Sequence, residues 1–293
     1  MEKTILKGCG TALVTPFRDG EVDYDSFKAL LGRQLSAGID FLVPLGTTAE
    51  TPCLSDDEKC RIMDIVSEEA GSTPYVIGCG TNSVAGTIRN IRLLEKYRPE
   101  AFLVVVPFYN KPTDEGLYMY FKAISEATDI PILLYNVPGR TGKNMTAATT
   151  LRLAGLPGIA GVKEASGKLD QVNDIIRNRP EGFAVLSGND DQTYEIMSAG
   201  GDGVISVVSN IAPDLMLSLT KALRDGNDAE ASRLNSLLMP LMKDCFMESN
   251  PVPAKGALSL MGLCRNECRL PLTPAAPGTL ARMKEILTPL GLL

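Results

Sequence analysis

Lys163 ends a short apolar run, residues 159–162, and is followed directly by Glu164. A lysine that is buried with a neutral amine is a nucleophile toward ketones and forms a Schiff base with them. The same position also suits a lysine whose charged end extends to solvent, or one that pairs with Glu164. Position alone leaves both interpretations open.

Other side chains that could take part in chemistry follow other apolar runs of the sequence. They are Tyr135, Arg140, Thr47, Thr48 and Tyr109. Taken singly, each has an ordinary structural explanation, such as a core aromatic, a solvated charge or a helix-leading turn. Taken together, they supply what a keto-acid aldolase or lyase needs, because tyrosines move protons and threonines and an arginine bind carboxylates.

The sequence contains no histidine. Histidine is the commonest general acid–base residue and the commonest metal ligand. Its absence excludes Ser-His-Asp and Cys-His triads and most catalytic zinc sites. Proton transfer near neutral pH then falls to tyrosine, lysine, a carboxylate, a thiol or water.

The seven cysteines are scattered without a CxxC pair, which predicts reduced and mostly buried thiols. Cys264 and Cys268 are four residues apart, but without a second pair or a histidine they do not predict a metal site. No GxGxxG fingerprint follows the first predicted strand, which disfavours dinucleotide binding. We expect neither a metal nor an organic cofactor.

Composition and charge limit the possible partners. The net charge of −6 disfavours nucleic acid, which binds basic surfaces. No apolar run approaches the roughly 18 residues of a membrane span, and the N-terminus lacks the pattern of a signal peptide. We expect a cytoplasmic protein with small-molecule substrates, bound to neither a membrane nor nucleic acid.

Eight apolar runs of strand length alternate with segments of helical periodicity, which is typical of an α/β protein with parallel strands. The runs are residues 10–16, 41–46, 75–80, 101–107, 130–138, 159–163, 183–188 and 203–208. Eight such units favour a closed (β/α)8 TIM barrel over an open sheet. The predicted helices between them are residues 25–37, 55–70, 84–97, 115–128, 147–154, 169–178, 192–199 and 213–224.

After residue 225 the sequence changes character, because three helical segments follow without strands between them. These segments are residues 229–243, 253–261 and 280–287. We predict a catalytic barrel domain at residues 1–225 and a C-terminal helical domain, an appendage to the barrel, at residues 226–293. Catalytic groups of such barrels lie at the C-terminal ends of the strands, where the candidate residues fall.

Six motifs in order carry a resemblance to a known family. They are GTTAE at 46–50, FYNKP at 108–112, YNVPGRTG at 135–142, GVKEASG at 161–167, LSGND at 186–190 and GVISV at 203–207. Over nearly its whole length the chain resembles the dihydrodipicolinate synthase branch of the N-acetylneuraminate lyase superfamily. The resemblance implies a lyase that condenses pyruvate with L-aspartate 4-semialdehyde to 4-hydroxy-tetrahydrodipicolinate, in lysine and diaminopimelate biosynthesis.

The resemblance also implies a role for each matching residue. Lys163 forms the imine with pyruvate, and Tyr135, Thr47 and Tyr109 form a hydroxyl relay for protons, with Tyr109 crossing a dimer interface. The substrate-binding residues it implies are Thr47 and Thr48 for the pyruvate carboxylate, Arg140 for the semialdehyde carboxylate, and Gly188 and the Ile205 carbonyl in the pocket wall. It further implies a homotetramer, a dimer of dimers.

Two departures from the family pattern bear on function. Ala49 replaces the usual glycine of GTTGE, so we expect a backbone conformation at this position that alanine tolerates. The residues matching the feedback site for lysine are also changed, because Gly86 replaces an acidic residue and Phe108 replaces a tyrosine. Asp56 and Lys59 stand where aromatic or histidine residues are usual, although Asn82 is retained. We predict an enzyme that is insensitive to lysine.

Three other functions remain to be weighed. A lyase of the same superfamily acting on N-acetylneuraminate or a 2-keto-3-deoxy sugar acid shares the lysine and tyrosine, but it generally lacks the turn at residues 139–141 and the FYNKP tyrosine. A non-catalytic barrel that binds pyruvate or amino acids has no need of the full lysine, tyrosine and threonine set. A phosphate-sugar barrel expects a glycine-rich phosphate cradle after strands seven and eight, for which this sequence offers little.

Overall fold

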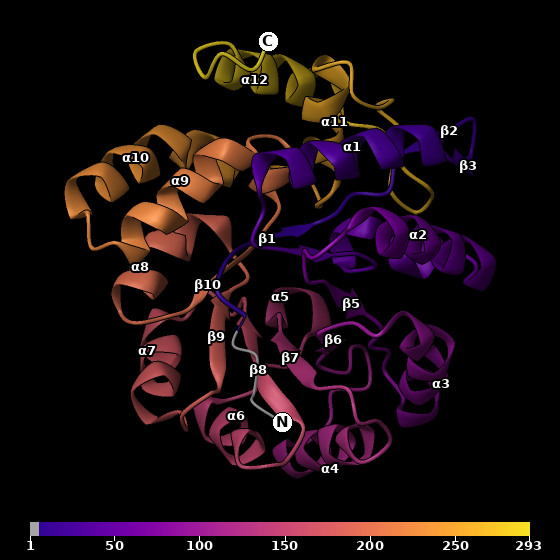
Figure 1. Ribbon diagram of the computed structural model, residues 1–293, viewed down its shortest axis with the longest axis vertical. Helices are drawn as coiled ribbons and strands as arrows, with labels where there is room; N and C mark the ends of the chain where they lie inside the picture. The colour runs from indigo at the N-terminus through magenta and orange to yellow at the C-terminus, as the bar shows by residue number, and fades with distance from the viewer. Residues whose placement is uncertain (1–5) are drawn as a thin grey trace. The chain divides into compact units, whose positions relative to one another are not determined.

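The computed structural model describes residues 6–293 of the chain. The fold is a (β/α)8 barrel with C-terminal helices, as eight strands of one parallel sheet alternate with helices along the chain (Figure 1). The strands are β1 (Gly8–Ala12), β4 (Phe41–Val43), β5 (Val76–Gly78), β6 (Ala101–Val105), β7 (Ile132–Asn136), β8 (Ile159–Glu164), β9 (Ala184–Ser187) and β10 (Gly203–Ser206). Each overlaps one of the eight predicted runs, and the predicted fold class is confirmed.

The chain falls into two compact units. The first contains the described residues up to Gly8 together with Pro74–Ile205, and the second contains Cys9–Thr73 and Ser206–Leu293. The predicted boundary between a barrel domain and a helical domain at residues 225 and 226 stays a prediction.

In the first unit, strands β5 to β10 lie in chain order within the sheet. Strands β6, β7, β8 and β9 are buried on both faces, which explains why their sequences are apolar rather than alternating. Neighbouring helices contact one another in chain order on the outer side of these strands (Figure 1). These helices are α3 (Val84–Leu94), α4 (Asp114–Ser125), α6 (Ala147–Ala154), α7 (Leu169–Asn178) and α8 (Thr193–Ser198).

One feature of this unit lies where the sequence predicted only a turn. A short helix, α5 (Pro138–Thr141), follows β7 directly, with Gly142 as its left-handed C-cap at φ 71. The 3-10 turns η3 (Glu95–Tyr97) and η4 (Asp190–Gln192) extend or lead the neighbouring helices. The sequence pattern missed α5 because a single helical turn carries no periodicity.

In the second unit, β1 pairs in parallel with β4, and the helices α1 (Tyr24–Ala37) and α2 (Asp56–Glu69) follow these two strands. A capping box begins α2, because the Ser55 hydroxyl accepts from the Glu58 N–H and the Glu58 carboxylate accepts from the Ser55 N–H. A small antiparallel hairpin, β2 (Phe17–Arg18) with β3 (Glu21–Val22), was not predicted from the sequence. The 3-10 turns of this unit are η1 (Thr47–Ala49), η2 (Thr51–Cys53) and η5 (Val208–Asn210).

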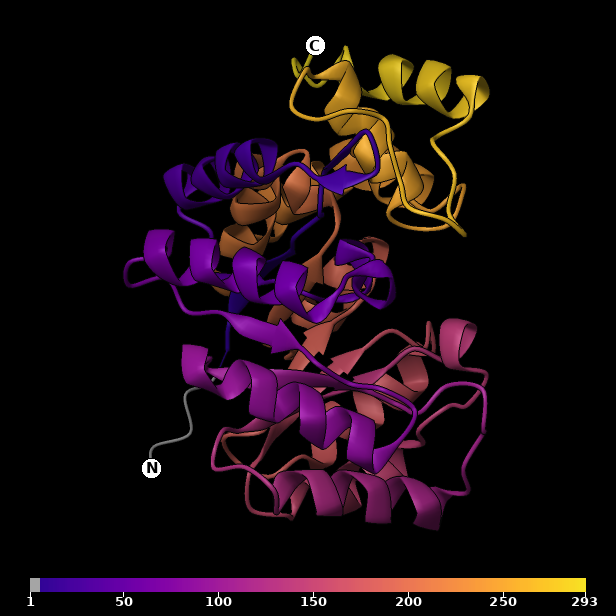
Figure 2. The same ribbon diagram turned by 90° about the vertical axis from the view of Figure 1, so that its right-hand side faces the viewer.

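The C-terminal part of the second unit is helical, as predicted. Its helices are α9 (Pro213–Arg224), α10 (Asp228–Asp244), α11 (Val252–Leu260) and α12 (Pro277–Leu287). Helix α9 packs on α10 (Figure 1), and α11 packs on α12 (Figures 1 and 2). Within residues 6–293, no helix is long and apolar enough to cross a membrane.

The loop between α11 and α12 is attached to α2 through Arg269. Its guanidinium donates to both oxygens of Glu58, with Nη1 2.8 Å from Oε2 and Nη2 2.5 Å from Oε1. It also donates to the carbonyl oxygens of Cys53 and Gly20. A bidentate arginine–carboxylate contact of this kind is stronger and more directional than a single hydrogen-bonded ion pair.

We predict that this contact makes stability depend on acid pH. The hydrogen bonds from Arg269 lower the pKa of Glu58 from its ordinary value of 4.5 to about 2. The unfolded chain therefore takes up a proton near pH 4.5 and the folded chain only near pH 2, so this stabilisation is present at neutral pH and is lost as the pH falls between these values. The difference in free energy of unfolding between wild type and Glu58→Gln, measured with urea, should be largest above pH 5 and shrink toward pH 2.

The control is Glu69→Gln at the far end of the same helix, where the ion pair with Lys28 is exposed. Exposed pairs contribute little, so its effect should stay within about 0.5 kcal/mol at every pH. A Glu58→Gln effect that is equally large at pH 2 and pH 7 would contradict the assignment.

Candidate active site

Lys163 and Tyr135 lie opposite each other on two neighbouring strands. Lys163 is in β8 and Tyr135 in β7, and the two residues are paired in the sheet register. Both are 6% exposed, and the Lys163 Nζ lies 4.4 Å from the centre of the Tyr135 ring. The structure therefore brings the predicted nucleophile and the predicted proton-transfer residue together in a buried position.

One extra residue in β8 produces this alignment. Ile132 pairs with Ile159, but the next residue of β7, Leu133, pairs with Gly161, so Ala160 has no opposite partner. An extra residue of this kind shifts the following register by one position. Without it, Tyr135 would lie opposite Val162, and the side chains of Lys163 and Tyr135 would point to opposite faces of the sheet.

The next strand also fits closely around Lys163. A Cβ built on Gly161 would lie 2.4 Å from the Ala184 carbonyl oxygen of β9, so only glycine is accommodated there. A Cβ built on Gly188 would lie 3.1 Å from the Lys163 Cε and 2.7 Å from the Ala165 Cβ. Gly188 therefore lies beside the lysine side chain, and its role in lining a substrate pocket stays a prediction.

Glu164 faces away from Lys163, because successive side chains of a strand point to opposite faces. Its carboxylate accepts hydrogen bonds from the Asn136 amide at 3.1 Å, the Gln171 amide at 3.1 Å and the Ser166 backbone N–H at 2.7 Å. The interpretation in which Lys163 pairs with Glu164 is therefore wrong. Burial raises the pKa of the Glu164 carboxyl, and the hydrogen bonds from Ser166 and Asn136 act in the opposite direction.

The hydrogen bonds of Glu164 form an outer network that follows the same strand register as the inner pair, Tyr135 and Lys163. Tyr135 is paired with Lys163, and the next residues, Asn136 and Glu164, are paired and hydrogen-bonded to each other. The network links the two strands on the face opposite the Lys163 and Tyr135 side chains. Sequence reasoning missed it, although both residues directly follow predicted site residues and strand alternation would have placed them together.

Arg140 and Tyr109 lie at the surface of the same unit. Arg140 is exposed on α5, whose end is held by the Thr141 hydroxyl donating to the carbonyls of Val137 and Lys143. Tyr109 is 89% exposed and adopts a left-handed backbone with φ 75. The structure does not bring Tyr109 into the buried surroundings of Lys163 within a single chain. Ile205 is fully buried in β10.

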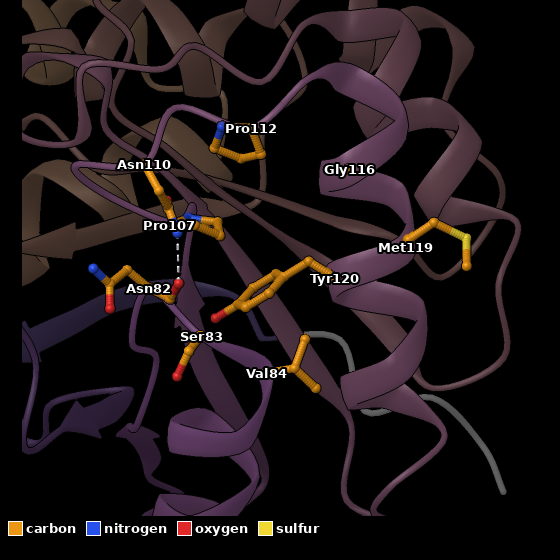
Figure 3. Close-up of a pocket in the computed structure, with 9 residues that line it drawn as sticks. All are labelled: Asn82, Ser83, Val84, Pro107, Asn110, Pro112, Gly116, Met119 and Tyr120. Carbon is orange, nitrogen blue, oxygen red and sulfur yellow. Dashed lines mark hydrogen bonds between the residues drawn. The ribbon is translucent and has the colours of Figure 1, made fainter.

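The loop that carries Tyr109 borders a cavity of about 300 Å³ (Figure 3). Pro107 and Asn110 belong to this loop, and the Asn110 amide donates to the Asn82 carbonyl at 2.9 Å. Tyr120 of α4 points toward the loop at the start of α3, where its hydroxyl donates to the Thr81 carbonyl. Asn82, which the sequence linked to feedback by lysine, therefore lines this cavity.

Thr47 and Thr48 belong to the second unit, where they form the 3-10 turn η1 with Ala49. Thr47 is half-buried and Thr48 is buried, and the Thr48 hydroxyl accepts from the Asn250 amide at 2.9 Å. The first N–H groups of a helical turn have no acceptor within it, so they are available to an anion. The left-handed residue is Glu50 at φ 53 rather than Ala49, which confirms the expectation that alanine is tolerated.

Comparison with known proteins shows to which family the chain belongs. Residues 5–290 match the Dihydrodipicolinate synthetase family. The chain belongs to this family. The resemblance inferred from the six motifs is thereby confirmed, and so is the expectation of a lyase.

Members of the family match the chain over its full length. The 4-hydroxy-tetrahydrodipicolinate synthase of Thermotoga neapolitana is 46% identical over 99% of this chain and 100% of its own. The crystal structure of dihydrodipicolinate synthase from Thermotoga maritima has a TM-score of 0.95 at 45% identity, covering 99% of this chain and 100% of the other. The chloride-inhibited enzyme of Acinetobacter baumannii, solved in complex with pyruvate, has a TM-score of 0.96 at 38% identity and covers 98% of this chain and 100% of its own.

We predict that Glu164→Gln loosens the pairing of β7 with β8. The substitution replaces an acceptor oxygen by an amide that donates, and this donor faces the donating groups of Asn136 and Gln171. A buried mismatch of this kind should lower the free energy of unfolding by about 1–3 kcal/mol, measured by urea titration at pH 7.

Asp170→Asn is the matched control, since it makes the same chemical change at an exposed residue in the first turn of α7. It should cost less than about 1 kcal/mol. If Glu164→Gln is as stable as this control, the outer network does not fix the register.

Proposed function

We propose that this protein condenses pyruvate with L-aspartate 4-semialdehyde to give 4-hydroxy-tetrahydrodipicolinate, with Lys163 as the Schiff-base nucleophile. The observation that carries the proposal is the buried pair of Lys163 and Tyr135, with the Lys163 Nζ 4.4 Å from the tyrosine ring. The names of the family members that match the full chain support the choice of reaction.

The chemistry follows from the groups in this pair. The Lys163 amine adds to the ketone carbon of pyruvate, and loss of water gives a protonated imine. The imine withdraws electrons, so a proton leaves the methyl group and an enamine forms. The enamine carbon then attacks the aldehyde carbon of the second substrate, whose oxygen gains a proton. The amino group of that substrate attacks the imine carbon and displaces the Lys163 amine, which closes the ring and frees the enzyme.

Tyr135 is the proton carrier of this scheme, since its ring stands beside the amine that gains and loses protons. A tyrosine in a hydroxyl chain exchanges protons more readily than an isolated one. Thr47 and Tyr109 complete that chain in the proposal. Nothing in these steps requires a metal or an organic cofactor.

The remaining residues bind and orient the two substrates. The backbone of Thr47 and Thr48 binds the pyruvate carboxylate, and the Arg140 guanidinium on exposed α5 binds the semialdehyde carboxylate. Gly188 and the Ile205 carbonyl line the pocket, and Gly188 leaves room for the lysine side chain. A carboxylate clamp distinguishes this reaction from that of a sugar-acid lyase, whose aldehyde has no carboxylate at this position.

We further infer that the working enzyme is an oligomer, a homotetramer built from dimers. Tyr109 is 89% exposed at a positive φ, and Phe108 beside it is 38% exposed, which is unusual for two aromatic residues on one loop. Contact with a second copy would cover this loop and carry Tyr109 into the partner's site. A cytoplasmic location is part of the same proposal.

We expect Lys163→Ala to lose the ability to trap pyruvate. After treatment with pyruvate and borohydride, mass spectrometry of the wild type should show one added pyruvyl group on Lys163, and none in the variant. Turnover with both substrates should fall by at least about a thousandfold, because the covalent route is removed. Lys168→Ala, at an exposed lysine nearby, should trap as the wild type does.

Two outcomes would overturn the proposal. One is trapping that survives in Lys163→Ala. The other is a wild type that traps pyruvate but shows turnover with N-acetylneuraminate or a 2-keto-3-deoxy sugar acid and none with aspartate semialdehyde. The second result would favour a sugar-acid lyase of the same superfamily.

We also expect no feedback by lysine. Gly86 leaves the first turn of α3 without a carboxylate for an α-amino group, and Phe108 offers no hydroxyl. A Cβ built on Gly86 would lie 2.8 Å from the Thr81 hydroxyl and 2.9 Å from the Ser83 hydroxyl, so this turn is packed for a glycine. Lysine added up to about 1 mM should leave the initial rate unchanged; half-inhibition below that concentration would require about 4 kcal/mol of binding and would contradict the prediction.

A further inference from the structure

Glu50 ends the turn that carries Thr47 and Thr48, and it does so in a strained conformation. Its φ of 53 lies in the left-handed region, which a side chain other than glycine adopts at a cost of about 1 kcal/mol or more. The residue is also 3% exposed, so its carboxylate is removed from water. A strained residue with a buried charge keeps its conformation only when the surrounding contacts fix it.

Those contacts come from the C-terminal part of the chain. The Lys255 Nζ in α11 lies 2.7 Å from the Glu50 Oε1, and the two side chains are 0% and 1% exposed. The other oxygen, Oε2, accepts from the backbone N–H of Arg269 at 2.9 Å. Both oxygens of the carboxylate are therefore held by residues more than 200 positions later in the chain.

A second link joins the same two segments. The Asn250 amide donates to the Thr48 hydroxyl at 2.9 Å, and both residues are buried. The turn is thus held at its middle by Asn250 and at its end by Lys255. Lys255 is fixed in turn by the ring of Phe17, whose centre lies 4.2 Å from Nζ.

Stability alone does not account for this ion pair. Removing two charges from water costs about as much as their attraction returns, so well-packed apolar residues of similar size are often as stable. What an ion pair provides instead is direction, because the carboxylate oxygens must point at their donors. Direction matters at this position, since the backbone of Thr47 and Thr48 precedes Glu50 by only two or three residues.

We propose that the buried pair of Glu50 and Lys255 positions the Thr47–Thr48 backbone for the carboxylate of pyruvate. Glu50 and Lys255 are positioning residues, because they act through the turn and not on the substrate. The C-terminal segment at residues 250–269 thereby sets the affinity for the first substrate and leaves that for the second unaffected. This inference rests on the proposed function, in which Thr47 and Thr48 bind pyruvate.

The test uses the double variant Glu50→Gln with Lys255→Met in the full-length protein. It removes both charges at nearly constant side-chain size, so no charge is left buried and unpaired, as one would be in a single variant. The amide carbonyl that Glu50→Gln introduces can still accept from the Arg269 N–H. We therefore expect a folded protein whose turn has lost its strongest directional contact.

Two readouts separate positioning from a merely structural role. The pyruvate concentration for half-maximal borohydride trapping of Lys163 should rise by about fivefold or more, whereas the KM for aspartate semialdehyde should change less than about twofold. Arg33→Met is the matched control in the same unit. It removes a half-buried cation that donates to the carbonyls of Asn210 and Ile211, and it should leave both values unchanged.

A second variant keeps the inference falsifiable if the double variant does not fold. Asn250→Ala removes the amide bond to Thr48 and leaves the ion pair in place. It too should raise the half-saturating pyruvate concentration, by about twofold or more, with an unchanged semialdehyde KM.

The outcomes distinguish this inference from the proposed function. If the wild type forms no adduct with pyruvate, the proposed function fails. If the wild type traps and the folded variants trap at the same pyruvate concentration, the function stands and the positioning role is wrong. A parallel rise in the constants of both substrates, matched by Arg33→Met, would likewise reduce the pair to a structural role.

Discussion

The register between β7 and β8 is the constraint on which the candidate site depends. A single unpaired residue, Ala160, sets Lys163 opposite Tyr135 on one face and Glu164 opposite Asn136 on the other. Side chains alternate along a strand, so a slip of one position would separate the amine from the tyrosine. Gly161 then allows β9 to pack closely against β8, and Gly188 allows the segment after β9 to approach Lys163 closely.

The two faces of strands β7 and β8 hold different kinds of side chain. The inner face holds a lysine and a tyrosine, and the outer face holds a buried carboxylate satisfied by neutral amide and backbone donors. Buried hydrogen-bond networks are strong when every group is satisfied, and they then fix one arrangement. The protein has no histidine, and the proposed mechanism relies on the position of Lys163 relative to Tyr135, so a rigid register would serve that mechanism directly.

The sequence was sufficient to predict what depends on local pattern. All eight strands and the longer helices follow from apolar periodicity, and the capping box at Ser55 and Glu58 follows from two residue types at a fixed spacing. Lys163 and Tyr135 became candidates because each ends an apolar strand, and their proposed roles came from the family resemblance. The hairpin at Phe17–Val22 was not predicted, since two-residue strands have no period to detect.

Other features depend on contacts between distant residues, and local pattern does not reveal these. The unpaired residue in β8 is visible only in the pairing with β7, and nothing in the letters around Ala160 marks it. The left-handed conformation falls at Glu50, whereas a family comparison draws attention to Ala49. Lys255 reads as an ordinary charge on a helix, and its complete burial against Glu50 appears only in three dimensions.

The distance along the chain between Glu50 and Lys255 has a consequence for how the protein is made. The two residues are 205 positions apart, and Arg269 lies further still toward the C-terminus. Synthesis proceeds from the N-terminus. The anchors of the turn at Thr47, which are Lys255 and Arg269, therefore become available only when almost the whole chain has left the ribosome. A prematurely terminated product that contains every strand would still lack these anchors, which links the finished site to the finished polypeptide.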